Sequence, residues 1–136
     1  MADRLHSAAI HLLRRLRVED EGLGISAPRL SALSVLVFAG PQRIGGLARI
    51  EQVEPPTMTR LIDGLERDGY VSRSPDPDDA RAVLVAATDR GRAALLEGRR
   101  RRVEAFSALL TTLPRKELEQ LARGVTALER ILRSTT

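Results

Sequence analysis

A short polar cluster near the middle of the chain has residue types that proteins use to contact nucleic acid. Thr57, Thr59 and Arg60 follow two consecutive prolines. Threonine hydroxyls bond phosphate or base edges and threonine methyls contact thymine, whereas arginine binds guanine through two hydrogen bonds. The alternative is that the threonines only cap a helix turn and that Arg60 is a solvated charge. The residues alone leave both interpretations open.

A second basic group follows a stretch rich in proline and aspartate. Arg81 ends this stretch, and an arginine at the tip of a hairpin can enter the narrow minor groove and neutralise phosphate. Asp79 is expected to orient Arg81 or to tie the wing to the domain, because a carboxylate facing DNA repels phosphate. Arg73 is expected to contact the DNA backbone. The alternative for all three is a surface ion-pair cluster, which contributes little stability.

The chain lacks the residue patterns of catalysis, so it is not expected to be an enzyme or to carry a cofactor. It has no cysteine, and no nucleophile–base pattern, P-loop or dinucleotide fingerprint occurs. His6 and His11 are five residues apart and do not share a helix face, so no metal site is expected. Asp76, Asp78 and Asp79 form a turn rather than a calcium loop, because the required glycine and distal glutamate are missing.

Composition indicates a single globular domain with a basic surface. The chain has 136 residues, of which 43% are hydrophobic and 29% charged. A start without a signal-peptide pattern and the lack of a long apolar run predict a soluble, cytoplasmic protein with no membrane partner. The net charge of +4 makes nucleic acid a candidate partner, although the positive excess lies in residues 89–136 and residues 40–88 are acidic overall. Three aromatic residues argue against a stacking platform for single strands.

The spacing of apolar residues predicts the elements that position these side chains. Helices are expected over 3–19, from a cap at Ser26 to Gly40-Pro41, over 44–51, and over 55–68 with an end at Gly69. Strands at 70–73 and 82–88 enclose a polar turn and form a hairpin. Two further helices are expected over 89–111, capped by Thr88, and over 115–133. The fold class is therefore mainly α with a small β-hairpin wing: a winged helix-turn-helix flanked by N- and C-terminal dimerisation helices.

The first helix and the last two are amphipathic but are separated in sequence by the winged unit. A chain this short offers few partners for three apolar stripes, so we expect them to interleave with those of a second chain in a two-fold dimer. One arginine of the 99–102 run faces this seam and could pair with Glu19, Asp20 or Glu21 of the other subunit. The alternative is that the run lies on solvated helix faces.

The order of elements and two motifs resemble the MarR family of dimeric winged-helix transcription regulators. Residues 57–73 are similar to the reading helix and first wing strand of that family, and residues 76–92 are similar to its wing and the start of the next helix. The chain departs from the family pattern at three places. Glu54 and two prolines replace a serine or threonine cap, Gly64 lies within the reading helix, and Ala80 replaces a frequent basic residue.

The resemblance implies one MarR-like domain over 1–136, with a DNA-binding unit at about 27–88 and a dimerisation region at about 1–22 and 89–136. It implies a homodimeric repressor that binds double-stranded DNA at a pseudo-palindromic operator and is relieved by a small aromatic or anionic effector. The DNA-binding residues would be Pro56, Thr57, Thr59, Arg60, Arg73, Asp79 and Arg81, and candidate effector-binding residues are His6, Ile10, Leu33 and Phe38. Two alternatives stay open: a dimeric ligand-binding protein without DNA recognition, and a non-specific architectural DNA binder.

Overall fold

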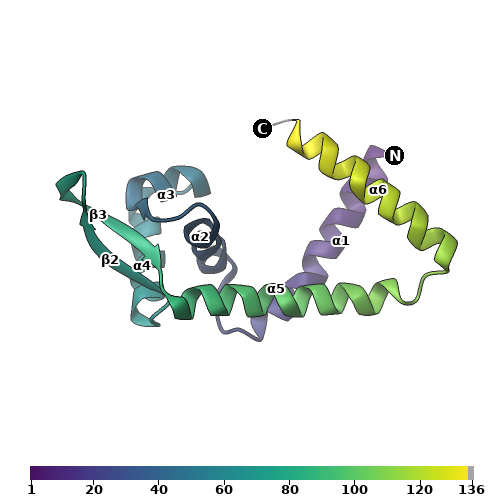
Figure 1. Ribbon diagram of the computed structural model, residues 1–136, viewed down its shortest axis with the longest axis horizontal. Helices are drawn as coiled ribbons and strands as arrows, with labels where there is room; N and C mark the ends of the chain where they lie inside the picture. Colours follow the sequence, from purple (N-terminus) through teal and green to yellow (C-terminus); the bar gives the residue numbers. More distant parts are fainter. Residues whose placement is uncertain (135–136) are drawn as a thin grey trace. The chain divides into compact units, whose positions relative to one another are not determined.

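The structure, a computed structural model, describes residues 1–134 and divides into two compact units. The first unit is Met1–Arg102 and the second begins at Val103. The elements along the chain (Figure 1) are α1 (Ala2–Glu21), α2 (Ala27–Phe38), β1 (Gln42–Arg43), α3 (Ile44–Glu51), α4 (Pro55–Arg67), β2 (Val71–Asp76), β3 (Asp79–Ala87), α5 (Asp89–Leu110) and α6 (Arg115–Arg133). Helix α5 begins in the first unit and ends in the second.

The core of the first unit lies between α2, α3, α4 and the sheet. Its largest fully buried side chains come from all four: Leu33, Leu47, Met58, Ile62, Leu65 and Val85. Each helix contributes apolar residues at helical spacing, so each presents one apolar face to this core. The three short helices therefore form a packed helix-turn-helix unit, and the sheet covers one side of it.

The sheet has three antiparallel strands in the order β1-β3-β2. Strands β2 and β3 form the expected hairpin, whose turn points away from the helices in Figure 1. The register is regular from Val71 opposite Ala87 to Pro75 opposite Val83, and it shifts between Pro75 and Asp76. Strand β1 was not predicted, because two residues after Gly40-Pro41 are too few to show an alternating pattern.

The junctions between the helices and the wing are set by glycine. Helix α4 ends at Arg67, and Gly69 adopts φ 80°, which places the Tyr70 N–H 2.8 Å from the Leu65 carbonyl oxygen. At the start of α5, the Thr88 hydroxyl accepts the Gly91 N–H at 3.1 Å, as expected for a cap. A β-carbon at Gly91 would overlap the Tyr70 carbonyl oxygen, so this position requires glycine.

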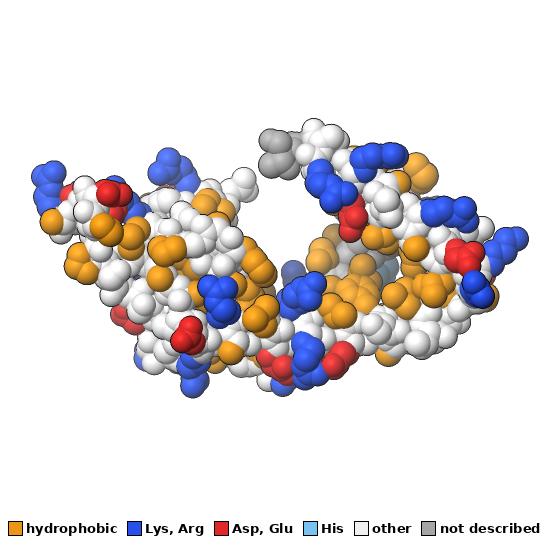
Figure 2. All heavy atoms as spheres, in the orientation of Figure 1, with side chains coloured by type: hydrophobic (Ala, Val, Ile, Leu, Met, Phe, Trp, Pro, Cys, Tyr) orange, Lys and Arg blue, Asp and Glu red, His pale blue; other side chains and the backbone are white. Residues whose placement is uncertain are grey.

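Helices α1 and α6 expose their apolar faces. Among the described residues, neither helix has a buried side chain. In α1, 52% of Leu5 and 58% of Leu13 are exposed, and in α6 the exposed apolar residues are Leu118, Leu121, Val125, Leu128, Ile131 and Leu132. Figure 2 shows hydrophobic side chains at the surface along α6. The described part of the chain contains no helix suited to crossing a membrane.

Element prediction from the sequence was accurate for the helices. The expected helices at 44–51 and 115–133 have the observed bounds, and those at 3–19, 55–68 and 89–111 differ from the observed ones by one or two residues at an end. The strands are longer than expected, at 71–76 and 79–87. The mainly α winged helix-turn-helix fold class is confirmed.

Replacing Gly91 with alanine should destabilise the protein strongly. The added methyl group would meet the Tyr70 backbone, which cannot move without disturbing the β2 start, so we expect a loss of about 1–3 kcal/mol in the free energy of unfolding. Urea unfolding followed by circular dichroism measures the change. Gly45→Ala is the matched control, since a β-carbon at Gly45 meets open space. Equal stability of the two variants would contradict the packing assigned to Gly91.

Candidate nucleic-acid interface

Packing of α4 fixes which of its side chains face solvent. Met58, Ile62 and Leu65 are buried on one face, at helical spacing. Thr57 and Arg60 are consequently exposed on the other side, as is Pro56 in the first turn. The N-terminal half of α4 therefore exposes Pro56, Thr57 and Arg60 to solvent, which is the part of a helix that contacts base edges when a helix enters the major groove.

The first turn of α4 has few groups for capping. Its N-cap is Glu54, whose side chain makes no capping hydrogen bond, and Pro55 and Pro56 have no N–H. Thr59 is half-buried and its hydroxyl donates to the Pro55 carbonyl oxygen at 3.0 Å. The Thr59 oxygen is therefore left as an acceptor, whereas Thr57 and Arg60 extend into solvent.

The wing presents one arginine at its tip. The side chain of Arg81 is 94% exposed, and its backbone N–H donates to Asp79 Oδ1 at 3.1 Å. The Arg81 Nε lies 3.7 Å from the same oxygen. Asp79 therefore contacts Arg81, as the sequence analysis expected, and leaves most of the guanidinium accessible.

A buried carboxylate holds the wing against β1. The Asp76 side chain is 6% exposed and accepts from Arg43 Nε at 2.6 Å and Arg43 Nη2 at 2.5 Å. It also accepts the Asp78 N–H at 2.9 Å. The Asp78 hydrogen bond and the Arg43 guanidinium lower the pKa of Asp76 below its ordinary value. The sequence predicts only a turn at Asp76 and carries no local pattern that marks Arg43 as its partner.

Arg73 connects the base of the wing to the reading helix. Its guanidinium donates to Asp63 Oδ1 at 2.6 Å and to Glu66 Oε1 at 2.7 Å, both on α4. The Asp63 hydrogen bond is the main cause of a raised Arg73 pKa. This is the ion-pair arrangement that the sequence analysis held as the alternative to a DNA-backbone contact.

The four candidate effector residues have different surroundings. Leu33 is fully buried in the core, whereas 71% of Phe38 is exposed and His6 and Ile10 lie on exposed α1. A cavity of about 170 Å³ between α1 and the start of α2 is lined by Arg17, Asp20, Glu21, Ile25, Ser26 and Ala27. None of the four candidates lines this cavity.

Among the described residues, no group of three acidic or histidine side chains is placed to hold a metal ion.

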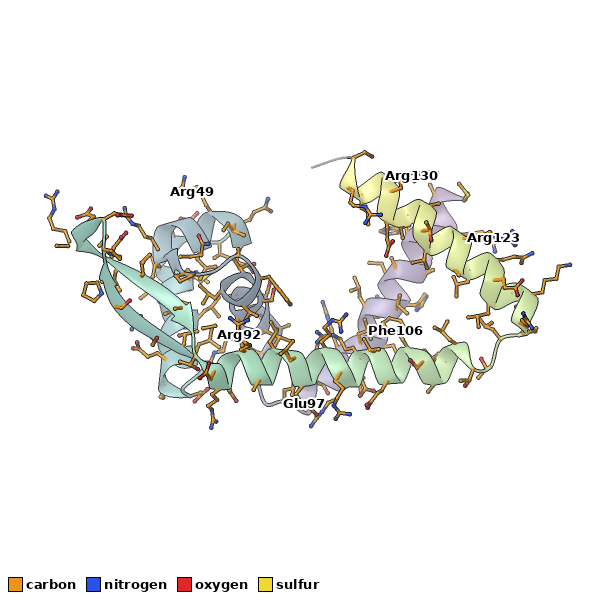
Figure 3. The ribbon with its side chains drawn as sticks, in the orientation of Figure 1. Arg49, Arg92, Glu97, Phe106, Arg123 and Arg130 are labelled. Carbon is orange, nitrogen blue, oxygen red and sulfur yellow. The ribbon has the colours of Figure 1, made fainter. Side chains whose placement is uncertain are left out.

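The arginine run on α5 forms ion pairs within its own chain. Arg102 pairs with Asp20, which the sequence analysis had assigned to a contact between subunits. Arg100 and Arg101 both donate to Glu97, at 2.9 and 3.0 Å, and these bonds lower the Glu97 pKa to about 2. Figure 3 labels Glu97 on α5. Asp20, near the end of α1, is thus occupied by a residue of its own chain, and a contact of Glu19, Asp20 or Glu21 with another subunit stays a prediction.

Replacing Asp76 with asparagine should lower stability at neutral pH. The carboxylate has a pKa below its ordinary value of 3.8, so it stabilises the folded state above that value and loses this effect as the pH falls through its lowered pKa. The difference in melting temperature between parent and Asp76→Asn should therefore shrink as the pH falls below 3.8. Thermal unfolding across this range measures it. Asp78→Asn is the control, since the hydrogen bond of Asp78 to Asp76 is made by its backbone N–H, which the substitution keeps. A difference that is constant with pH would contradict the assignment.

Comparison with known proteins identifies the family. Residues 25–83 match the model of the MarR family. An uncharacterized HTH-type transcriptional regulator of Mycobacterium bovis is 39% identical over 121 residues, which cover 89% of this chain and 85% of that protein. The transcriptional activatory protein BadR of Rhodopseudomonas palustris is 39% identical over 92 residues, covering 65% and 53% of the two chains.

A solved structure agrees with this match. A mutant of MarR from Escherichia coli superimposes with a TM-score of 0.79 at 25% sequence identity, over 97% of this chain and 96% of that one. The shared fold includes the helix-turn-helix and wing described above. The chain belongs to the MarR family and is a DNA-binding transcriptional regulator with a winged helix-turn-helix.

Proposed function

We propose that this regulator acts as a homodimeric repressor at a pseudo-palindromic operator. The observation that carries the proposal is the pair of exposed basic elements in one winged unit: Arg60 on the solvent face of α4 and Arg81 at the wing tip. Each subunit would place residues 55–66 in a major groove and its wing in the flanking minor groove. Two-fold symmetry would separate the half-sites by about one helical turn, roughly 34 Å.

The proposed contacts divide into base reading and backbone positioning. Thr57 and Arg60 are the exposed candidates for base edges, with Pro56 beside them and Thr59 as an acceptor. Arg81, oriented by Asp79, would enter the minor groove. We propose Arg73 as a residue that positions the wing on α4, and its contact with phosphate as secondary, because two carboxylates already bind it.

The exposed apolar faces of α1 and α6 support a homodimer. Contact of a leucine and valine stripe with water is unfavourable, so such a stripe on a helix is normally covered by another apolar surface. We propose the division expected from the sequence, with the DNA-binding unit at about 27–88 and the dimerisation region at about 1–22 and 89–136, of which 135–136 lie outside the described residues. A symmetric dimer would also present two copies of α4 to one face of DNA.

Repression and an effector rest on the family resemblance. A dimer that covers an operator blocks access to the promoter. A ligand that favours another spacing of the two reading helices would lower the affinity of the dimer for the operator and so relieve repression. We propose a small aromatic or anionic effector, with His6, Ile10, Leu33 and Phe38 as the residues to test. Since BadR is named an activatory protein, a reporter gene under this chain's own promoter decides the direction. Binding to promoter DNA would place the protein in the cytoplasm.

Replacing Arg81 with alanine should weaken binding to promoter DNA at least tenfold, about 1.4 kcal/mol, and leave the fold intact. The guanidinium is almost fully exposed, so its removal disturbs little packing. Fluorescence anisotropy with a labelled duplex from the protein's own promoter measures affinity. Arg115→Ala is a matched control, because Arg115 is also 94% exposed and also pairs with a neighbouring carboxylate. Equal affinities for the two variants would contradict the DNA contact proposed for Arg81, and a parent that does not bind the duplex would favour a protein that has lost DNA recognition.

Placing a charge on the apolar face of α6 should dissociate the dimer. Val125→Glu puts a carboxylate on a stripe that the proposal buries between subunits, and burying an unpaired charge is unfavourable. The parent should show a molar mass of twice 14.9 kDa by light scattering, and Val125→Glu should show the monomer mass. Arg123→Glu changes a residue off that stripe and should leave the dimer intact. A parent of monomer mass would refute the proposed assembly.

A further inference from the structure

Gly64 lies in the middle of the reading helix α4, where glycine is unfavourable. A glycine inside a helix destabilises it relative to alanine, because the unfolded backbone has more freedom to lose. Gly64 has ordinary helical geometry and is not among the glycines with positive φ. Its backbone conformation therefore does not account for the residue, and the explanation has to come from what packs against it.

The side chain of Arg29, from the start of α2, occupies the space of the missing β-carbon. A β-carbon built at Gly64 would overlap the Arg29 guanidinium and would lie 2.7 Å from its Nε. Gly64 is buried, and the Arg29 side chain is 30% exposed. The guanidinium thus lies across the backbone of α4, in the space that a β-carbon at position 64 would take, and alanine there would make this end of the Arg29 side chain move.

Arg29 continues beyond Gly64 to the C-terminal end of the same helix. Its Nη1 lies 3.5 Å from Oδ2 of Asp68, the C-cap residue of α4. The last carbonyl groups of a helix carry partial negative charge, which a carboxylate at the C-cap increases and a nearby cation offsets. A positive charge from α2 at this end is therefore favourable both for the helix and for Asp68.

We propose that Arg29 is a positioning residue for the reading helix, and that glycine at position 64 lets the Arg29 guanidinium lie against α4. The inference rests on the proposed function only in its effect on DNA. Arg60, the candidate base contact, lies one helical turn before Gly64, so a shift of α4 at Gly64 moves Arg60 relative to the wing. Arg29 and Gly64 together would set the rotation and height at which α4 meets the DNA.

A double-mutant cycle tests the proposal: the parent, Gly64→Ala, Arg29→Ala and the double variant. Thermal unfolding gives Tm for each protein. Anisotropy gives affinity for a duplex from the protein's own promoter and for a scrambled duplex. Gly45→Ala is the control for helix propensity, because its β-carbon meets open space.

When Arg29 is present, Gly64→Ala should not raise Tm. It should lower the affinity for the promoter duplex at least about threefold and leave binding to scrambled DNA unchanged. Arg29→Ala should lower promoter affinity similarly. Once Arg29 is removed, Gly64→Ala should raise Tm by about 2–4 °C, as alanine fills an empty space, and should cause no further loss of affinity.

Three results would overturn the proposal. In the first, Gly64→Ala raises the Tm of the parent as much as Gly45→Ala does. In the second, its effect on Tm is the same with and without Arg29. In the third, Arg29→Ala lowers Tm but leaves promoter affinity unchanged, which would make Arg29 a structural residue only. A parent that does not distinguish the two duplexes would instead contradict the proposed function, and the Tm cycle would still decide the Arg29–Gly64 contact.

Discussion

The burial of one face of α4 is the constraint on which the rest of the molecule depends. Met58, Ile62 and Leu65 are inaccessible to solvent, and they pack with Leu33 of α2 and Leu47 of α3. Burying three residues at this spacing fixes which face of α4 meets the core and limits the rotation of the helix about its axis to small adjustments. The exposed side of α4, and with it the position of Arg60, follows from the core.

Ion pairs then fix the remaining degrees of freedom. Asp76 joins the wing to Arg43 at β1, Arg73 joins the wing to α4, and Arg29 joins α2 to α4. These contacts also give several acidic residues of 40–88 a structural role. Asp63, Glu66 and Asp76 pair with Arg73 and Arg43 inside the unit, so these carboxylates position its elements.

The sequence predicted the helices and the wing because those elements depend on local patterns. Apolar spacing located α3 and α6, and the turn-rich segment before Arg81 located the hairpin. The pairing of Asp79 with Arg81 was also predicted, since the two residues are neighbours in the chain.

Contacts between residues far apart in the sequence could not be predicted from local patterns. Arg43 and Asp76 are 33 residues apart, and no local pattern links a residue of the two-residue strand β1 to the last residue of β2. The same limit explains why Asp20 was assigned to another subunit. The sequence shows that Gly64 is unfavourable within a helix, but the contact that explains this glycine involves Arg29 of α2, which only the structure shows. The dimer and the effector depend on a second chain or a ligand, so they remain predictions.

The most direct test of the account is the binding of the purified protein to its own promoter region and to a scrambled duplex. Affinity is measured at two salt concentrations, with the molar mass of the free protein and of the complex. We expect two chains per duplex, a preference for the promoter of roughly a hundredfold or more, and weaker binding at higher salt. Equal affinity for both duplexes, or one chain per duplex, would contradict the proposal that a dimer reads a specific operator.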